Sequence, residues 1–174
     1  MPPKPPQALL DLKAKLPDPF HRAPDPTGRR SISVSRRIAA PPARIFALLA
    51  DPRRHPDFDG SETVIALRPG APTRLGPGVQ FAMDMRRGTR YRVVNTVMEF
   101  DEGRQIAWAH RAGHRWRFRL EPLDDGAATM LTETFDWSTA VVPALIERLG
   151  FPERNRPGME ATLARIDQLV TAPD

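Results

Sequence analysis

The stretch VQFAMDMRRGTRYRVVNTVMEF, residues 79–100, decides the fold because its first half carries apolar side chains at every second position. Similar alternation recurs in later runs up to Trp137, and a period of two is typical of strands with one buried face. Glycine supplies the positive φ that tight hairpin turns require. Glycine turns separate the runs: Gly88, Gly103, Gly113 and Gly126. The sequence therefore predicts an antiparallel meander from Val79 to Trp137.

Two strands and a helical pattern precede the meander. Residues 32–38 alternate as a first strand, and residues 41–50 carry an apolar helical stripe with Pro42 in the first turn, where its missing N–H costs nothing. Residues 53–60 leave room for one more turn of helix, and a second strand is expected at 63–67. These elements would place two short helices directly after the first strand.

Helical patterns also end the chain. Residues 141–149 predict a short helix closed by Gly150, with Phe151-Pro152 as a stop signal beyond it. A longer helix is expected with Pro157 near its start, because apolar residues recur from there at three- and four-residue steps. The predicted fold is thus α+β: a curved antiparallel sheet of six to seven strands wrapped around a long C-terminal helix.

Composition narrows the function classes. The 174 residues are 40% apolar and hold no cysteine, which excludes disulfides, thiolate metal sites and cysteine nucleophiles. No apolar run approaches the roughly 20 residues of a membrane span, and no secretory signal begins the chain, so we expect a cytoplasmic protein. We expect a proline-rich N-terminal extension at 1–30, which could mediate a homodimer, and a single domain at 31–174.

The net charge of +5 raises the question of a polyanionic partner. Arginines are dispersed in pairs rather than gathered on one recognition helix, so nucleic acid is not expected as a partner. Arg115, Arg117 and Arg119 alternate with apolar residues, which indicates the solvated face of one strand. A polyanion-binding stripe at these arginines is the lesser alternative.

Four segments resemble the polyketide cyclase/dehydrase and lipid-transport family, part of the START-related SRPBCC superfamily. They are IAAPPARIFALLADP at 38–52, YRVVN at 91–95, GRQIAW at 103–108 and TETFDWS at 132–138. The resemblance covers about residues 31–170 and implies the helix-grip fold, with an apolar cavity between the sheet and the C-terminal helix. It further implies a hydrophobic or aromatic ligand, polyketide- or lipid-like. Members include cyclases that work by general acid/base chemistry and non-catalytic carriers or sensors, and both alternatives stay open.

Glu133 is the leading candidate for chemistry in such a cavity. It alternates with Leu131 and Phe135, so its carboxylate should point inward, where burial would raise its pKa and suit it to general acid or base catalysis. An ion pair with a neighbouring arginine, or a position at the solvated end of the strand, is the structural alternative. No cofactor is expected for such a mechanism.

His110 and Tyr91 are the other catalytic candidates. His110 follows Trp108 on one face, although His110 and His114 also bracket a turn where histidines are commonly solvated. A two-residue turn at Glu102-Gly103 would point Tyr91 inward, whereas a bulged turn would point it outward. We expect these residues to bind the ligand: Phe81, Met83, Asn95, Trp108, Trp116, Phe118, Phe135, Met159 and Leu163.

A metal site is not expected. His55, Asp57 and Asp59 lie close together in sequence, but no second cluster completes a coordination shell, and Asp59-Gly60 is ordinary turn chemistry. A contact at the mouth of the cavity suits His55, Asp57 or Phe58 better.

Overall fold

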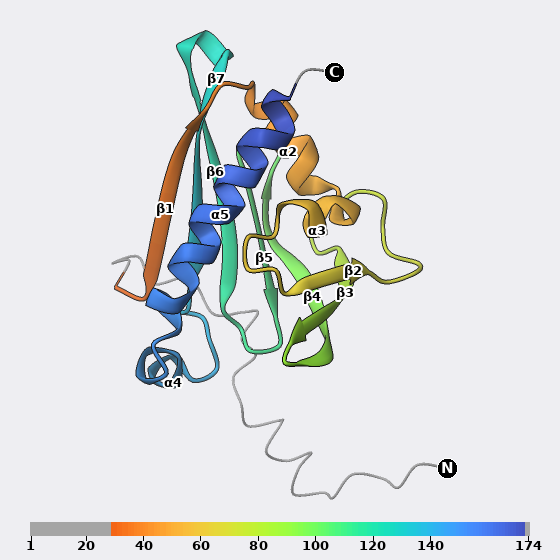
Figure 1. The fold of residues 1–174 in the computed structure, drawn as a ribbon, viewed down its shortest axis with the longest axis vertical. Helices are drawn as coiled ribbons and strands as arrows, with labels where there is room; N and C mark the ends of the chain where they lie inside the picture. Colours follow the sequence, from red (N-terminus) through yellow and green to blue (C-terminus); the bar gives the residue numbers. More distant parts are fainter. Residues whose placement is uncertain (1–28, 173–174) are drawn as a thin grey trace, which may run out of the picture.

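A computed structural model describes residues 29–172, and its centre is one seven-stranded antiparallel sheet in the order β1-β7-β6-β5-β4-β3-β2. The elements, in chain order, are β1 (Ser31–Ile38), α2 (Pro42–Ala50), η2 (Pro52–Arg54), α3 (His55–Phe58), β2 (Val64–Leu67), β3 (Gln80–Arg87), β4 (Thr89–Asp101), β5 (Gln105–His110), β6 (Arg115–Leu123), η3 (Asp124–Gly126), β7 (Ala128–Asp136), α4 (Pro143–Arg148) and α5 (Phe151–Thr171). Helix α5 crosses one face of the sheet, and α2 and α3 cover the same face beside it (Figure 1). The predicted α+β, helix-grip architecture is confirmed.

The start of α5 corrects the sequence prediction. The helix begins at Phe151, six residues before Pro157, which was expected near its start, and runs for 21 residues. Pro152, the expected stop signal, lies in the first helical turn, where a missing N–H leaves no hydrogen bond unmade. Gly150, at φ 66°, both ends α4 and precedes α5. A glycine in the left-handed region between two helices therefore has the pattern of a helix C-terminus, although the next helix begins at the following residue.

The predicted extension at 1–30 lies almost wholly outside the described residues, and the homodimer that it could mediate stays a prediction. The core of the described part forms where α2 and α5 meet the inner face of the sheet. Its fully buried side chains include Phe46, Leu49, Ile106, Leu131 and Ile166.

A β-bulge in β4 settles which side chains of that strand face inward. Val97 pairs with Trp108, whereas Glu99 pairs with Ala107, so Met98 is the extra residue. Asn95 and Val97 are therefore buried on the inner face before the bulge, and Phe100 packs against the core after it. The sequence left two alternatives for this strand, with Tyr91 facing inward or outward. The inward alternative holds before the bulge and the reversed facing holds after it, because one extra residue reverses the facing of every later side chain in the strand.

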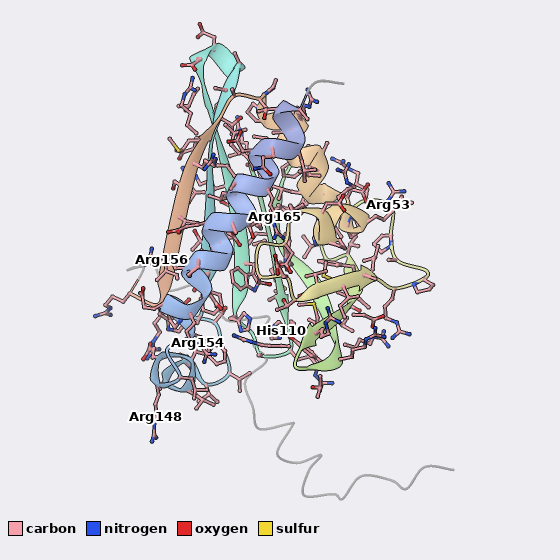
Figure 2. The ribbon with its side chains drawn as sticks, viewed as in Figure 1. Arg53, His110, Arg148, Arg154, Arg156 and Arg165 are labelled. Carbon is pink, nitrogen blue, oxygen red and sulfur yellow. The ribbon has the colours of Figure 1, made fainter. Side chains whose placement is uncertain are left out.

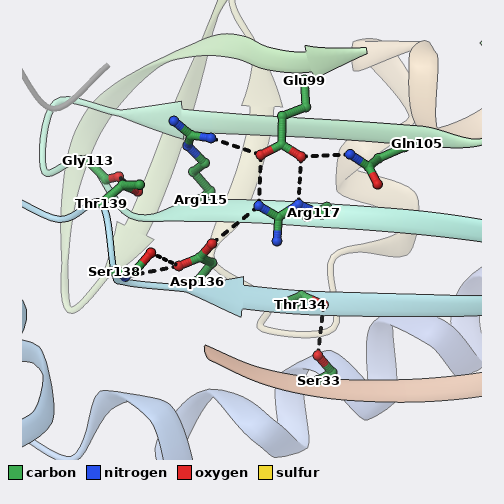
Figure 3. Close-up of polar contacts among 10 residues, drawn as sticks. All are labelled: Ser33, Glu99, Gln105, Gly113, Arg115, Arg117, Thr134, Asp136, Ser138 and Thr139. Carbon is green, nitrogen blue, oxygen red and sulfur yellow. Dashed lines mark hydrogen bonds and ion pairs between the residues drawn. The ribbon is translucent and has the colours of Figure 1, made fainter. Parts of the chain in front are cut away.

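The bulge also turns Glu99 to the outer face, where it meets two arginines of β6 (Figure 3). Its carboxylate accepts hydrogen bonds from Arg115 at 2.9 Å and from Arg117 at 2.6 Å, and Arg117 also bonds Asp136 at 3.2 Å. Arg115 is buried and Arg117 nearly so, because the small side chain of Ala107 lets Glu99 reach across the intervening strand.

The predicted solvated face is thus wrong for two of its three arginines. Only Arg119, paired with Glu121, has the exposed side chain that alternation predicted.

We predict that Glu99→Gln lowers the free energy of unfolding by about 1–2 kcal/mol at neutral pH, because the buried Arg115 and the largely buried Arg117 lose a charged partner. Burial of Glu99 opposes its ionisation, but Arg117 and Arg115 outweigh this and hold its pKa below the ordinary value of 4.5. Its contribution is present above pH 4.5 and is lost as the pH falls through the lowered pKa. Urea unfolding across this range should show the gap between wild type and variant closing on acidification.

The control for this prediction is Glu102→Gln. Glu102 pairs with Arg74 at the surface, where both side chains are exposed, so the change should stay within about 0.5 kcal/mol. An equal loss in both variants would contradict a special role for Glu99.

Candidate functional site

A cavity of about 860 Å³ lies between the inner face of the sheet and α5. Cavities that hold small molecules in proteins run from roughly 300 to 1,000 Å³, so this one has room for a large ligand. Its walls come from β3 to β7, from the loop after α3, and from the start of α5. Seven of the residues expected to bind a ligand line it: Met83, Asn95, Trp108, Trp116, Phe118, Phe135 and Met159.

Phe81 and Leu163 are placed differently from the expectation. Both are almost fully buried in the core and neither lines the cavity. The ring of Phe81 instead contacts Trp108 edge-on, with centroids 6.0 Å apart. Alternation correctly indicated that both side chains face inward. Each packs into the hydrophobic core and does not reach the cavity surface.

Glu133 lies in this wall and is 4% exposed. Its neighbours across the sheet are Val34 on one side and Phe118 on the other, so the described residues surround it with apolar side chains. Its Oε2 atom is buried without a hydrogen-bond partner, and no ion pair to it is found in residues 29–172. Burial, aided by the charge of Asp59, raises the pKa of Glu133 well above its ordinary value. The side chain therefore stays protonated at pH values above 4.5, where an ordinary glutamate begins to ionise.

His110 and His114 form a hydrogen-bonded pair in the same cavity, with their Nε2 atoms 2.9 Å apart. The backbone N–H of Ala112 donates to His110 Nδ1 at 3.1 Å, which requires that nitrogen to be unprotonated. In the neutral ring the proton then sits on Nε2 and is donated to His114 Nε2. This leaves the proton of neutral His114 on Nδ1, a buried atom with no partner.

Both histidines are held neutral. Burial lowers the pKa of His110, and burial together with the repulsion that a protonated His110 would exert lowers the pKa of His114 to about 3. Neither ring is the solvated turn residue that their spacing suggested. The sequence did contain a signal for His114, because it alternates with Trp116 and Phe118 on the inner face.

The aromatic rings of Trp116 and Phe135 separate the two unpartnered polar groups. Glu133 pairs with Phe118, and His114 lies four residues back along that strand, roughly 13 Å at strand spacing. The Trp116 and Phe135 rings lie between them with centroids 4.8 Å apart. The cavity wall therefore carries a pair of contacting aromatic rings, Trp116 and Phe135, with His114 toward one end and Glu133 toward the other.

Tyr91 and Asn95 both line the cavity, as the inward orientation required. Tyr91 is 43% exposed and lies at the rim, away from the buried carboxyl group. Asn95 is buried, and its Nδ2 contacts the sulfur of Met83 at 4.0 Å.

His55 also lines the cavity, but as a buried structural group. Its Nε2 atom lies 3.0 Å from the carbonyl oxygen of Leu49, and its ring stacks on Trp108 with centroids 4.8 Å apart. Burial lowers its pKa to about 4, so it is neutral at physiological pH. Residues 29–172 contain no grouping of three or more His, Asp or Glu side chains that could hold a metal ion.

The loop after α3 closes the cavity against α5. Asp59 accepts hydrogen bonds from the backbone N–H groups of Ser61, Thr63 and Val64, which fixes the loop shape. The backbone N–H of Gly60 donates to Thr162 Oγ1 on the helix at 2.9 Å.

Arg165, on α5, adds two further bonds, to the carbonyl oxygen of Asp59 and to the Glu62 carboxylate. Figure 2 shows Arg165 midway along α5 and His110 farther down the same view, toward α4. No sequence pattern indicated this clamp between loop and helix.

Comparisons with known proteins agree with this architecture. Residues 29–171 match the family described as "Polyketide cyclase / dehydrase and lipid transport". The uncharacterized protein Rv0088 of Mycobacterium tuberculosis is 38% identical over 144 residues, which is 80% of this chain and 63% of that protein. The chain thus spans less than two thirds of the length of this relative.

Solved structures share the fold at low identity. Protein CV1439 of Chromobacterium violaceum superimposes with a TM-score of 0.62 at 21% identity, covering 83% of this chain and 99% of that one. The Polyketide_cyc-like protein Cgl2372 of Corynebacterium glutamicum gives 0.51 at 19% identity, covering 80% and 90%. No helix within residues 29–172 is both long and apolar enough to cross a membrane.

Proposed function

Because the chain belongs to the polyketide cyclase/dehydrase and lipid-transport family, we propose that it binds a hydrophobic or aromatic small molecule carrying carbonyl oxygens and moves protons on that molecule. One observation carries the proposal. Two polar atoms, His114 Nδ1 and Glu133 Oε2, are buried without partners beside an apolar cavity of about 860 Å³. Each such atom costs about 1–3 kcal/mol unless something bonds it, and a ligand with matching oxygens would remove that cost.

The two groups suit different parts of one reaction. A neutral imidazole that donates from Nδ1 can polarise a ligand carbonyl, and its lowered pKa keeps it a donor without charge. A protonated Glu133 can donate to a second carbonyl oxygen, and the resulting carboxylate can take a proton from the adjacent carbon. This exchange converts ketone to enol and restores the acid. An enol formed in this way is a carbon nucleophile for cyclisation.

His110 acts as a positioning residue in this scheme. It does not need to touch the ligand, because its Nε2–H sets the tautomer of His114. Tyr91, at the rim, could hydrogen-bond a ligand oxygen near solvent.

A matched ligand pair tests the proposal. Trp108 and Trp116 line the cavity, so binding should change tryptophan fluorescence in a saturable way. We predict that wild type binds 2-acetylnaphthalene about fivefold more tightly than 2-ethylnaphthalene, which lacks the carbonyl oxygen, since one neutral hydrogen bond is worth about 1 kcal/mol. His114→Phe should bind both equally.

The control variant is Arg111→Gln, in the same turn but outside the cavity lining. It should keep the preference for the ketone. Absence of saturable binding of either naphthalene to the wild type would contradict the proposed function.

A carrier or sensor role is the second candidate. It would use the same hydrogen bonds without proton transfer, and the apolar lining supports it equally. The isotope-exchange experiment in the Discussion separates the two.

A further inference from the structure

Three arginines line the mouth of the cavity: Arg86, Arg87 and Arg154. All are exposed, and none forms an ion pair with a carboxylate among residues 29–172, whereas most other described arginines do. Arg154 and His110 appear at the same end of the molecule in Figure 2. The mouth therefore carries positive charge that the described residues leave unneutralised.

Two of these arginines, Arg87 and Arg154, contact the same aromatic ring, that of Phe151. The guanidinium carbons of Arg87, at the end of β3, and of Arg154, in the first turn of α5, each lie 5.8 Å from the centroid of the Phe151 ring. Phe151 itself lines the cavity. This shared ring brings arginines from two distant parts of the chain to one side of the opening. Two like charges so placed favour an anion between them.

The carboxylates of the lining are already engaged or out of reach. Asp59 accepts backbone hydrogen bonds from its own loop, and Glu62 pairs with Arg165. Glu153, beside the mouth, pairs with Arg156. Glu133 is buried in the wall among apolar side chains. The described acidic groups therefore leave the charge of Arg87 and Arg154 available to a ligand.

We propose that the ligand is an amphipathic anion, with its apolar body in the cavity and one carboxylate or phosphate monoester held by Arg87 and Arg154 at the mouth. This inference rests on the proposed function, because it names the chemical class of molecule that the same cavity takes. Guanidinium groups present paired N–H donors that match the oxygens of either anion, which gives orientation as well as affinity. With its head group held at the mouth, the ligand would place its apolar body in the cavity against Trp116 and Phe135.

The test uses N-phenyl-1-naphthylamine, a neutral fluorescent probe, displaced by three ligands with the same alkyl chain: dodecanol, dodecanoate and dodecyl phosphate. Wild type should bind one or both anions about tenfold more tightly than the alcohol, which corresponds to one charge-assisted hydrogen-bonding group. The comparison of the two anions identifies the head group. Raising the salt concentration should weaken anion binding and leave dodecanol unaffected.

The double variant Arg87→Gln, Arg154→Gln should lose the preference for the anion and bind dodecanol within about twofold of wild type. Arg148→Gln is the matched control, since Arg148 is an exposed arginine of the neighbouring helix α4 that does not line the cavity. Circular dichroism and thermal melts of each variant check that the fold is retained.

The possible failures are distinguishable. If the probe and dodecanol bind wild type but both anions bind no better, or if the double variant keeps the preference, the anion site is refuted and cavity binding survives. If neither the probe nor any of the three ligands binds, the proposed function fails and this inference fails with it.

Discussion

Glu133→Gln is expected to make the protein more stable than wild type at about pH 8, by about 1 kcal/mol, or roughly 2–4 °C in Tm for a chain of this size. Burial raises the pKa of Glu133 above its ordinary value of 4.5. A group with a raised pKa in the folded state contributes stability that is present below pH 4.5 and is lost as the pH rises through the folded pKa. Glutamine keeps the shape and cannot ionise, so the variant escapes this loss.

The measurement is thermal unfolding of both proteins at several pH values from about 4.5 upward, with the gap in Tm widening as the pH rises. Glu121→Gln, an exposed residue of β6 that pairs with Arg119, is the control and should leave Tm nearly unchanged. A variant that is less stable than wild type by the same amount at every pH would contradict the buried, unpartnered carboxyl group.

The same variant tests catalysis. With 2,6-diacetylnaphthalene bound in D₂O, one carbonyl at His114 and the second toward Glu133, wild type should speed deuterium uptake at the methyl group next to the second carbonyl, and Glu133→Gln should lose this acceleration while still binding the ketone. General acid–base groups contribute about 10²–10⁴-fold in rate, so the effect would be easily measured by mass spectrometry. Bound ketone without acceleration in the wild type would instead favour the carrier or sensor.

Gly60→Ala is expected to lower the free energy of unfolding by about 3 kcal/mol, or roughly 6–12 °C in Tm. A Cβ atom at this position would lie 2.2 Å from the carbonyl oxygen of Gly158 and 2.3 Å from the backbone N of Thr162. Both are helix backbone atoms, which cannot rotate away as a side chain can. The loop must therefore lift off α5, breaking the hydrogen bond from Gly60 to Thr162 and opening the cavity wall.

Two other glycines provide controls for this prediction. A Cβ on Gly158 would meet Ser61 at 3.5 Å, an ordinary contact, and alanine is the better helix former by about 1 kcal/mol. Gly158→Ala should therefore be neutral or stabilising, although it faces the same loop. Gly76→Ala meets only Val79 at 3.8 Å and should change Tm little. A mild effect of Gly60→Ala, similar to these, would show that the loop is free to shift.

Ligand affinity should follow the same order. If the Gly60 contact holds the cavity wall in place, Gly60→Ala weakens binding of the naphthalene probes, whereas Gly76→Ala, outside the cavity lining, leaves it unchanged. Unchanged binding by Gly60→Ala would assign the contact to stability alone.

Local patterns predicted most of the fold because each depends on neighbours in sequence. Period-two alternation and turn glycines placed the meander, and helical periodicity placed α2 and the body of α5. The prediction of the start of α5 was wrong because the same sequence pattern is typical of two different structures. Gly150 followed by Phe151-Pro152 indicates a helix end equally well as the first turn of the next helix.

For the candidate site, the sequence could predict which side chains face the inside of the sheet, but not what they contact there. Alternation indicated that Glu133 points inward, and the same rule applied to His114 would have placed it beside Trp116. A histidine next to a turn is commonly solvated, and this second pattern favoured the opposite facing. The facing of Tyr91 and Asn95 depended on the bulge at Met98, which leaves no clear mark in the sequence.

The sequence by itself determined which segments become strands and helices and which side of each is apolar, since these follow from the order of residues along the chain. Only the tertiary structure decided what those side chains meet. The pairing of His110 with His114, the lack of a partner for Glu133, the burial of Arg115 and Arg117 around Glu99, and the fit of Gly60 against α5 all join residues from different elements. Their distances, and with them the pKa values and the cavity, depend on how the sheet curves around the helix.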